Sequence, residues 1–342
     1  MMKSFSRLPI AVTMGEPAGI GGEITLRAWA LRQENIPPFF VIDEAKRLQT
    51  IAAHFRIDCP ITVIDSPEAA IEVFKTALPV LPIDKKIGSA STLGSPTPSN
   101  SPAVVASIDR AVSLVNRGKA SAVVTNPIQK SLLVSNDFPF PGHTEYLGHL
   151  AGSCSPVMML AIEGLRVVPV TIHIAIKDVA NALTTELIVH CGRVTASALQ
   201  ADFGIQCPRL AVAALNPHAG EHGRMGTEET RIIIPAINQL KGEGIQAFGP
   251  APADTLFHEN ARKTFDAALC MYHDQALLPL KTIDFASGVN ITLGLPFVRT
   301  SPDHGTACDI AAKGIADPSS LLAALRTAYI IALNRAKSLS NG

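Results

Sequence analysis

The sequence predicts an α/β fold of two domains, in which mostly parallel strands are covered by helices. Three observations lead to this prediction. The chain has 342 residues, which suggests more than one domain. Its hydrophobic residues, 47% of the total, are mainly aliphatic, with one Trp and three Tyr. Short apolar runs alternate with longer amphipathic stretches, which is the order that parallel sheets with crossover helices produce.

The predicted elements follow one another along the chain. Short aliphatic runs predict strands at residues 8–14, 39–42, 122–125, 157–162, 167–176, 210–215 and 267–271. Amphipathic stretches predict helices at residues 22–33, 101–117, 184–201, 228–240 and 321–338. Residues 79–102 are crowded with Pro, Ser and Gly, so we expect a long surface loop there.

Charge and cysteine content exclude several classes of protein. Lys and Arg number 29 and so do Asp and Glu, so the net charge of zero argues against nucleic acid or an anionic membrane as the main partner. The N-terminal apolar stretch is short and contains Pro9, which makes a poor signal peptide, and we expect a cytoplasmic protein. The six cysteines are scattered without a C-x-x-C pair, which is typical of small core residues.

Three of the ten histidines lie at or just past the carboxyl ends of predicted strands. They are His173, His218 and His273. Parallel sheets form ligand sites at that edge, so the three side chains are candidates for one metal site. Three neutral imidazoles leave open positions on a divalent cation, as a catalytic Lewis acid requires. Their spacing matches no local zinc motif, and hydrogen-bonded core histidines remain the alternative.

Two segments carry groups suited to small anions. Residues 141–145 precede a helical stretch, so backbone N–H groups and the Thr144 hydroxyl are candidates to hold a phosphate or carboxylate. An ordinary helix cap is the alternative there. Lys281, Asn290 and Arg299 lie in or beside a segment punctuated by Gly and Pro after His273, and they are further candidates for gripping an anion.

Familiar nucleotide and hydrolase motifs are missing. Residues 14–22 follow a strand and open a helix, but they match neither G-x-G-x-x-G nor G-x-x-x-x-G-K-[ST]. A dinucleotide, if bound, is therefore held by something other than the usual Rossmann fingerprint. The chain also lacks a G-x-S-x-G elbow, which disfavours a serine hydrolase.

Five segments together resemble the 4-hydroxythreonine-4-phosphate dehydrogenase family of pyridoxine biosynthesis. They are residues 15–21, 141–145, 215–221, 271–275 and 288–296, in the family's order. Gly22 departs from the family's usual Pro, which removes no chemical group. The resemblance implies an isocitrate/isopropylmalate dehydrogenase-like fold: two α/β/α domains with a central cleft and mixed, mostly parallel sheets. We expect a cofactor-side domain of residues 1–130 plus 300–342, and a metal, substrate and dimerisation domain of residues 131–299.

The resemblance also implies roles for individual residues. His173, His218 and His273 become ligands of one divalent metal such as Zn, Co or Mg, with one histidine supplied by the partner subunit of a homodimer whose active site lies at the interface. The implied substrate-binding residues are His143, Thr144, Lys281, Asn290 and Arg299. Asp254 and Asp274 match acidic residues near the metal and are candidate catalytic groups.

A second, more distant resemblance concerns the cofactor. Residues 304–318 are similar to the adenosine-binding loop of isopropylmalate and isocitrate dehydrogenases, although Cys308 and Ala312 replace Pro and Gly. The cofactor-binding residues that this similarity implies are His304, Gly305, Thr306, Ala307, Asp309 and Ile310. By that analogy Asp309 accepts hydrogen bonds from a ribose diol and repels a 2′-phosphate. We therefore expect NAD, with NADP as the alternative.

The implied reaction is an oxidation followed by loss of carbon dioxide. 4-Phosphooxy-L-threonine is oxidised at C3 to 2-amino-3-oxo-4-phosphooxybutanoate, which decarboxylates to 3-amino-2-oxopropyl phosphate. A sister dehydrogenase acting on 4-phospho-D-threonate or 4-phospho-D-erythronate is the alternative. A zinc hydrolase or a non-catalytic ligand binder is a third possibility, which the loop at residues 304–318 disfavours because neither needs a nucleotide site.

Overall fold

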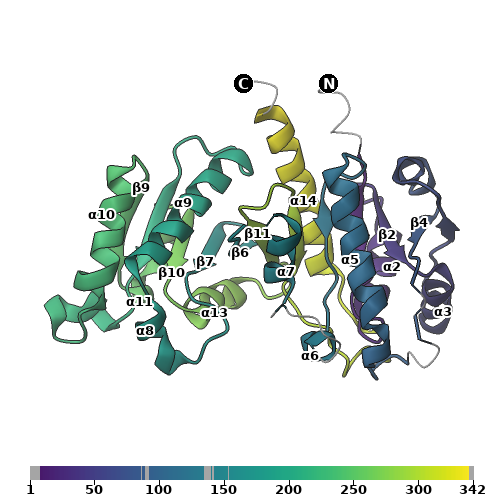
Figure 1. The fold of residues 1–342 in the computed structure, drawn as a ribbon, viewed down its shortest axis with the longest axis horizontal. Helices are drawn as coiled ribbons and strands as arrows, with labels where there is room; N and C mark the ends of the chain where they lie inside the picture. The colour runs from purple at the N-terminus through teal and green to yellow at the C-terminus, as the bar shows by residue number, and fades with distance from the viewer. Residues whose placement is uncertain are drawn as a thin grey trace. The chain divides into compact units, whose positions relative to one another are not determined.

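The computed structural model describes residues 8–85, 87–88, 92–134, 140, 142–152 and 154–338. The chain divides into two α/β units (Figure 1). Unit 1 combines Met1–Ser155 with Leu295–Gly342, and unit 2 is Pro156–Gly294. Residues 131–155 and 295–299, which the sequence analysis assigned to the second domain, fall in unit 1. The predicted α/β class with mostly parallel strands is confirmed.

Unit 1 contains a parallel sheet. Its strands, in spatial order, are β3 (Ile61–Val63), β4 (Leu78–Pro82), β2 (Phe39–Asp43), β1 (Ile10–Thr13), β5 (Val123–Val124) and β12 (Arg299–Pro302). The prediction of a loop from residue 79 was wrong at its start, because residues 79–82 belong to β4. Leu78, Val80 and Leu81 are buried there, and their burial outweighs the local excess of Pro.

The core of unit 1 follows the two-residue period of its strands. Ala11, Phe40 and Ile42 pack in one cluster with residues of α5 (Ser101–Asn116). Figure 1 shows α5 alongside this sheet. Helix α14 (Ser319–Ser338) contacts β12 and α2 (Gly21–Ala30). The shorter helices of unit 1 are α3 (Ala45–Phe55), η1 (Pro67–Ala69), α4 (Ala70–Val73), η2 (Pro98–Asn100), α6 (Lys130–Val134) and α7 (His143–Leu150).

Unit 2 contains a mixed sheet. Its strands, in spatial order, are β11 (Val289–Leu293), β6 (Val157–Ile162), β7 (Leu165–Pro169), β10 (Ala267–Cys270), β8 (Arg209–Ala213) and β9 (Gln246–Ala251). β6 runs antiparallel to β11 and β7, whereas β7, β10, β8 and β9 are parallel to one another. The predicted strand 167–176 was too long, because β7 ends at Pro169 and His173 has a φ of 48°, which no strand accommodates.

Helices cover this second sheet too. α13 (His273–Ile283) contributes Ala276 and Leu280 to a cluster with strand residues of β6, β7, β8 and β10. α9 (Thr185–Ala201) and α10 (Ile234–Gly242) lie against each other, and both contact strands of the sheet. The predicted helix 228–240 begins as a π-helical turn, η5 (Glu229–Ile233), and continues as α10. The remaining short helices are η3 (Ile176–Asp178), α8 (Val179–Ala182), η4 (Pro217–Gly223), α11 (Ala253–Leu256) and α12 (Glu259–Arg262).

The cysteines are unpaired, as the sequence predicts, but only half of them are core residues. All six are free thiols: Cys59, Cys191 and Cys270 are buried, Cys154 and Cys308 are partly buried, and Cys207 is exposed. Burial raises the pKa of each of the three buried thiols, so they stay protonated and unreactive. Among the described residues, the helices are too short or too polar to cross a bilayer.

We expect Leu160→Ala to lower the free energy of unfolding by about 3 kcal/mol, because Leu160 is 1% exposed and its loss leaves a cavity in the unit 2 core. Val63→Ala is the control: Val63 is 53% exposed in edge strand β3, so its change should stay within ~0.5 kcal/mol. Urea denaturation measures both values. Equal losses for the two variants would contradict this assignment of the core.

Candidate functional site

The three candidate metal-binding histidines follow three neighbouring parallel strands of unit 2. His173 follows β7, His273 opens α13 directly after β10, and His218 lies in η4 after β8. The spatial order β7-β10-β8 makes these strands adjacent, and their parallel pairing delivers their carboxyl ends to one edge of the sheet. The structure therefore places all three histidines at the same edge of unit 2.

His173 and His273 are brought together. Their ring centroids lie 5.7 Å apart. His273 Nδ1 is 2.8 Å from Asp274 Oδ1, a contact that orients the ring and leaves Nε2 available. In the part of the chain that the structure describes, no group of three His, Cys, Asp or Glu side chains is arranged to hold a metal ion. One chain thus supplies a pair of imidazoles, which fits the nitrogen ligands that Zn²⁺ and similar ions take but leaves the set incomplete.

His218 lies in a left-handed turn. The φ angles are 51° at His218, 52° at Ala219, 74° at Gly220, 40° at Glu221 and 56° at His222. Left-handed backbone costs a non-glycine residue roughly 1–2 kcal/mol. Only one of these five positions is Gly, so the surrounding structure must compensate for strain at the other four.

The buried carboxylate of Glu229 accepts hydrogen bonds from the residues that lead into this turn. Glu229 is 2% exposed, and its Oε1 accepts hydrogen bonds from the backbone N–H of Leu215 (2.9 Å) and of Asn216 (2.7 Å). Its Oε2 accepts from Asn216 Nδ2 at 3.0 Å, and Glu228 Oε2 accepts from the same amide nitrogen at 2.7 Å. The sequence carries no signal for Glu228 and Glu229. At the start of a predicted amphipathic helix, acidic residues are usually exposed to solvent.

The other predicted residues of unit 2 lie on three separate elements. Asn290 is in β11, and its Oδ1 atom is shielded from solvent with no hydrogen-bond partner among the described residues. Lys281 is on α13, with Nζ 5.2 Å from the ring centroid of Phe285. Asp254 is exposed on α11. The structure thus leaves Asn290 with an acceptor available for a ligand.

In unit 1, the predicted anion-binding residues include a buried cation and a neutral imidazole. Arg299 is 3% exposed in β12, and its Nη2 donates to Thr125 Oγ1 at 2.6 Å. His143 is the first residue of α7, and its Nε2 is shielded from solvent without a hydrogen-bond partner among the described residues. Thr144 follows it in the first turn. Pro141, which also belongs to the predicted motif, lies outside the described residues.

Burial and positive neighbours set the protonation of this group of side chains. Desolvation, followed by the charges of Arg299 and Lys130, holds the pKa of His143 well below 6.5. Burial lowers the pKa of Arg299 to about 10, which still leaves it charged at neutral pH. Lys130 is the first residue of α6. The sequence did not identify it as a site residue, because its polar neighbours are typical of an exposed segment. Two cations beside a neutral imidazole suit a phosphate or carboxylate ligand.

The predicted cofactor residues lie on a loop that packs against the segment after β1. Ile20 N–H donates to the Thr306 carbonyl at 3.0 Å, and the Thr306 hydroxyl donates to Gln129 Oε1 at 3.0 Å. A Cβ on Gly19 would lie 2.8 Å from the Thr306 carbonyl oxygen, so this close approach requires glycine. His304, Gly305, Ala307, Asp309 and Ile310 belong to the same loop, and Asp309 is exposed.

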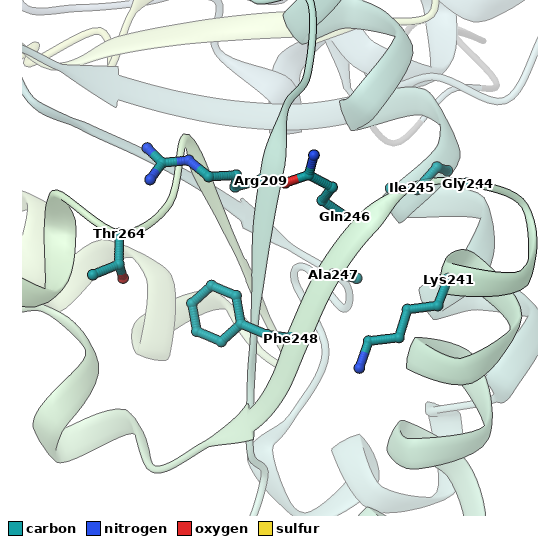
Figure 2. A pocket seen from close by; sticks show the side chains of 8 residues that line it. All are labelled: Arg209, Lys241, Gly244, Ile245, Gln246, Ala247, Phe248 and Thr264. Atoms are coloured by element: carbon teal, nitrogen blue, oxygen red, sulfur yellow. The ribbon is translucent and has the colours of Figure 1, made fainter.

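The structure contains two pockets of note. The unit 1 pocket, of about 700 Å³, is lined by residues of α3, by Pro17, by described residues between 87 and 93, and by Ala312 of the predicted cofactor loop, but not by residues 304–310. The unit 2 pocket, of about 440 Å³, lies along β9 (Figure 2). Figure 2 shows Arg209, Lys241 and Phe248 lining it. Arg209 is already engaged by Asp266 at 3.1 Å. Neither pocket is lined by a predicted metal or substrate residue.

Comparison with known proteins gives consistent matches along most of the chain. A family model described as pyridoxal phosphate biosynthetic protein PdxA matches residues 35–328. The 4-hydroxythreonine-4-phosphate dehydrogenase of Methylorubrum populi is 51% identical over 338 residues, which cover 97% of each chain. The enzyme of the same name from Caulobacter vibrioides is 52% identical over 334 residues, covering 96% of this chain and 98% of the relative.

A solved structure agrees with this result. The crystal structure of 4-hydroxythreonine-4-phosphate dehydrogenase from Klebsiella pneumoniae is similar to this one, with a TM-score of 0.84 and 36% sequence identity. The match covers 95% of this chain and 99% of that one. Sequence and fold therefore point to the same group of proteins.

We expect the His143 ring to remain neutral at pH 6, which the ring signals in NMR measure directly. A histidine with a lowered pKa binds fewer protons in the folded protein than in the unfolded chain. Its contribution to stability is therefore present above pH 6.5 and declines as the pH falls below that value. Lys130→Met should raise the pKa of His143 but leave it below 6.5, because burial is the larger cause. A midpoint at or above 6.5 in the unaltered protein would contradict this description.

Proposed function

Because the chain belongs to the pyridoxal phosphate biosynthetic protein PdxA family, we propose that it is an NAD-dependent, divalent-metal-dependent dehydrogenase of 4-phosphooxy-L-threonine. The observation that carries the proposal is the placement of His173, His273 and His218 after three adjacent parallel strands. The named relatives support the substrate, since they are 4-hydroxythreonine-4-phosphate dehydrogenases.

The proposed reaction breaks the C3–H bond of the substrate. The hydride passes to NAD, the hydroxyl proton passes to a base, and the product is 2-amino-3-oxo-4-phosphooxybutanoate. This β-keto acid then loses carbon dioxide and takes up a proton, giving 3-amino-2-oxopropyl phosphate. A divalent cation, when bound, supplies Lewis acidity that lowers the pKa of the C3 hydroxyl and stabilises negative charge at that oxygen.

In unit 2, histidines and carboxylates have separate roles. We assign His173, His218 and His273 as the metal ligands. Asp274 sits against Nδ1 of His273, so its first role is to fix the orientation and tautomer of that ring. Asp254 and Asp274 remain the candidates for the base, and both are exposed. Lys281 and Asn290 are assigned to the substrate, with the buried Oδ1 of Asn290 ready to accept a hydrogen bond from it.

In unit 1, Arg299, His143 and Thr144 are assigned to the anionic groups of the substrate. Arg299 stays charged although it is buried. A phosphate or carboxylate can therefore accept strong, directional hydrogen bonds from its guanidinium group. His143 stays neutral, and its shielded Nε2 can either donate or accept according to its tautomer. These groups orient the substrate, and orientation of the reacting carbon is a large part of what an enzyme contributes.

The cofactor is assigned to the loop that carries His304, Gly305, Thr306, Ala307, Asp309 and Ile310. Hydrogen bonds to Ile20 and Gln129 fix this loop at Thr306. Arg27 Nη2 donates to the Gly314 carbonyl at 2.7 Å, and Ala316 N–H donates to Glu23 Oε1 at 3.2 Å. The exposed Asp309 carboxylate favours a ribose diol over a 2′-phosphate, so NAD is preferred to NADP.

A homodimer with the site at its interface is part of the proposal. Large apolar side chains are exposed in the segments that follow the histidine-bearing strand ends. They are Ile174 (43%), Ile176 (75%), Met225 (43%), Leu278 (66%) and Phe285 (76%). Apolar side chains gathered in neighbouring segments are typical of protein interfaces. A second copy covering them would bring a further histidine to the incomplete imidazole pair. The proposed location of the reaction is the cytoplasm.

With Zn²⁺ or Co²⁺ present, we expect the protein to reduce NAD when 4-phosphooxy-L-threonine is added, as measured by the absorbance of reduced nicotinamide. 4-Phospho-D-threonate and 4-phospho-D-erythronate should react more slowly, and NADP should give a lower kcat/KM than NAD. His218→Ala should abolish most of the activity, whereas Glu243→Gln, which alters only surface contacts with Arg193 and Gln239, should not.

Each result has a clear opposite. Faster turnover of either of the other phosphorylated acids would replace the proposed substrate with that acid. Comparable kcat/KM for the two cofactors would contradict the role of Asp309. No reduction of NAD with any of the three acids would overturn the dehydrogenase proposal itself.

A further inference from the structure

We propose that Glu229 is a positioning residue that holds the left-handed turn carrying His218 in the shape in which the imidazole can bind a metal. The inference rests on the proposed function for the role of His218 itself. It adds a residue outside the ligand set, reached through the backbone of residues 215–216. The geometry of the turn and the burial of Glu229 carry it.

Backbone geometry shows why the turn needs support. Every residue from His218 to His222 has a positive φ, and four of the five are not glycine. His218 and His222 are both exposed, so the packing of their own side chains does little to hold this conformation. Hydrogen bonds from residues that flank the turn are therefore needed to stabilise it.

Glu229 supplies that support at the entrance. The carboxylate accepts hydrogen bonds from two consecutive backbone N–H groups, those of Leu215 and Asn216, and from the Asn216 side chain. Asn216 is two residues before His218, so fixing its backbone and side chain fixes the direction in which the chain enters the turn. Charged acceptors make the strongest bonds of this kind, and Glu229 is 2% exposed.

The inside of the turn is also shaped around this carboxylate. Gly220 has a φ of 74°, and a Cβ at that position would lie 2.6 Å from Glu229 Oε2. Glycine is required there for two reasons, the backbone conformation and the close approach of the carboxylate. Met225 N–H donates to the Gly220 carbonyl at 3.1 Å and closes the turn on its other side. Glu229 thus contacts both the entrance and the middle of the turn.

Glu229 is the first residue of a π-helical turn. η5 covers Glu229–Ile233, and an extra residue in a helical turn shifts the direction of the side chains before it. Such turns occur often at functional sites. Ile233, at the other end of η5, is fully buried, which anchors the turn to the core of unit 2.

The test compares the full-length protein with Glu229→Gln and Glu229→Ala, using Glu243→Gln as the matched carboxylate-to-amide control in the same unit. Two quantities are measured: hydrogen exchange of the Leu215 and Asn216 amides without metal, and the dissociation constant for Co²⁺ from its visible absorption. Glu229→Gln keeps the volume of the side chain but replaces one carboxylate oxygen with an NH₂ group. The remaining oxygen is neutral, so it accepts hydrogen bonds from the Leu215 and Asn216 amides less strongly. We expect exchange at both amides to be about tenfold faster and Co²⁺ binding to be about 10–100-fold weaker.

Glu229→Ala should have larger effects of the same kind, and Glu243→Gln should change neither quantity. Unchanged exchange at Leu215 and Asn216 in Glu229→Gln would overturn the proposal. Faster exchange with unchanged Co²⁺ affinity would also overturn it, because the glutamate would then support the fold without presenting His218. If His218→Ala binds Co²⁺ as tightly as the unaltered protein, the metal role of His218 fails separately, and the exchange data show whether Glu229 still holds the turn.

Discussion

Parallel pairing of β7, β10 and β8 is the constraint on which the candidate site depends. Strands that run in the same direction end at the same edge of their sheet, so the segments that follow them meet there. His173, His273 and His218 come from positions far apart in the sequence, and this pairing places them at one edge of unit 2. A one-residue change in strand register would move each histidine relative to the others.

Strain and burial at that edge are balanced by specific polar contacts. The left-handed turn at His218 is unfavourable for four of its residues, and a buried carboxylate that accepts three hydrogen bonds stabilises it. Unit 1 uses a related arrangement, because the buried Arg299 is stabilised by Thr125 and lies near enough to His143 to depress its pKa. In both units, groups that would be costly to bury alone are fixed before a ligand arrives, which is how functional sites are commonly organised.

Local pattern predicted seven of the twelve described strands and the three longest helices, α5, α9 and α14, but it missed β3, β9, β11 and β12, the helices α3 and α13, and the irregular backbone. The aliphatic runs at residues 39–42 and 157–162 matched β2 and β6 closely, because burial on both faces leaves a clear signal. The strand predicted at residues 167–176 was too long, because apolar residues continue past Pro169 although the strand ends there. β4 was missed for the opposite reason, since its prolines resemble those of a loop.

The site was predictable as chemistry and less so as geometry. Strand ends identified His173, His218 and His273 as candidates. Local residue chemistry identified candidates for anion binding, and the resemblance to a family added His143 and assigned them to the substrate. Nothing in the sequence pattern shows that Glu229 contacts Asn216, because the two residues lie on separate elements and Glu229 opens a π-helical turn that a helical period does not reveal. The same holds for Lys130 beside His143, since the two lie on separate short helices. Contacts of this kind arise from tertiary packing, which periodicity does not record.

The most direct test of the central claim is a crystal structure of the protein grown with Zn²⁺, with anomalous scattering measured at the zinc edge. The account predicts one strong peak per site, about 2.0–2.1 Å from an imidazole nitrogen of His173, His218 and His273, with one of the three contributed by a second copy of the chain. A peak bound by other residues, or one that lacks any of these three histidines, would contradict it.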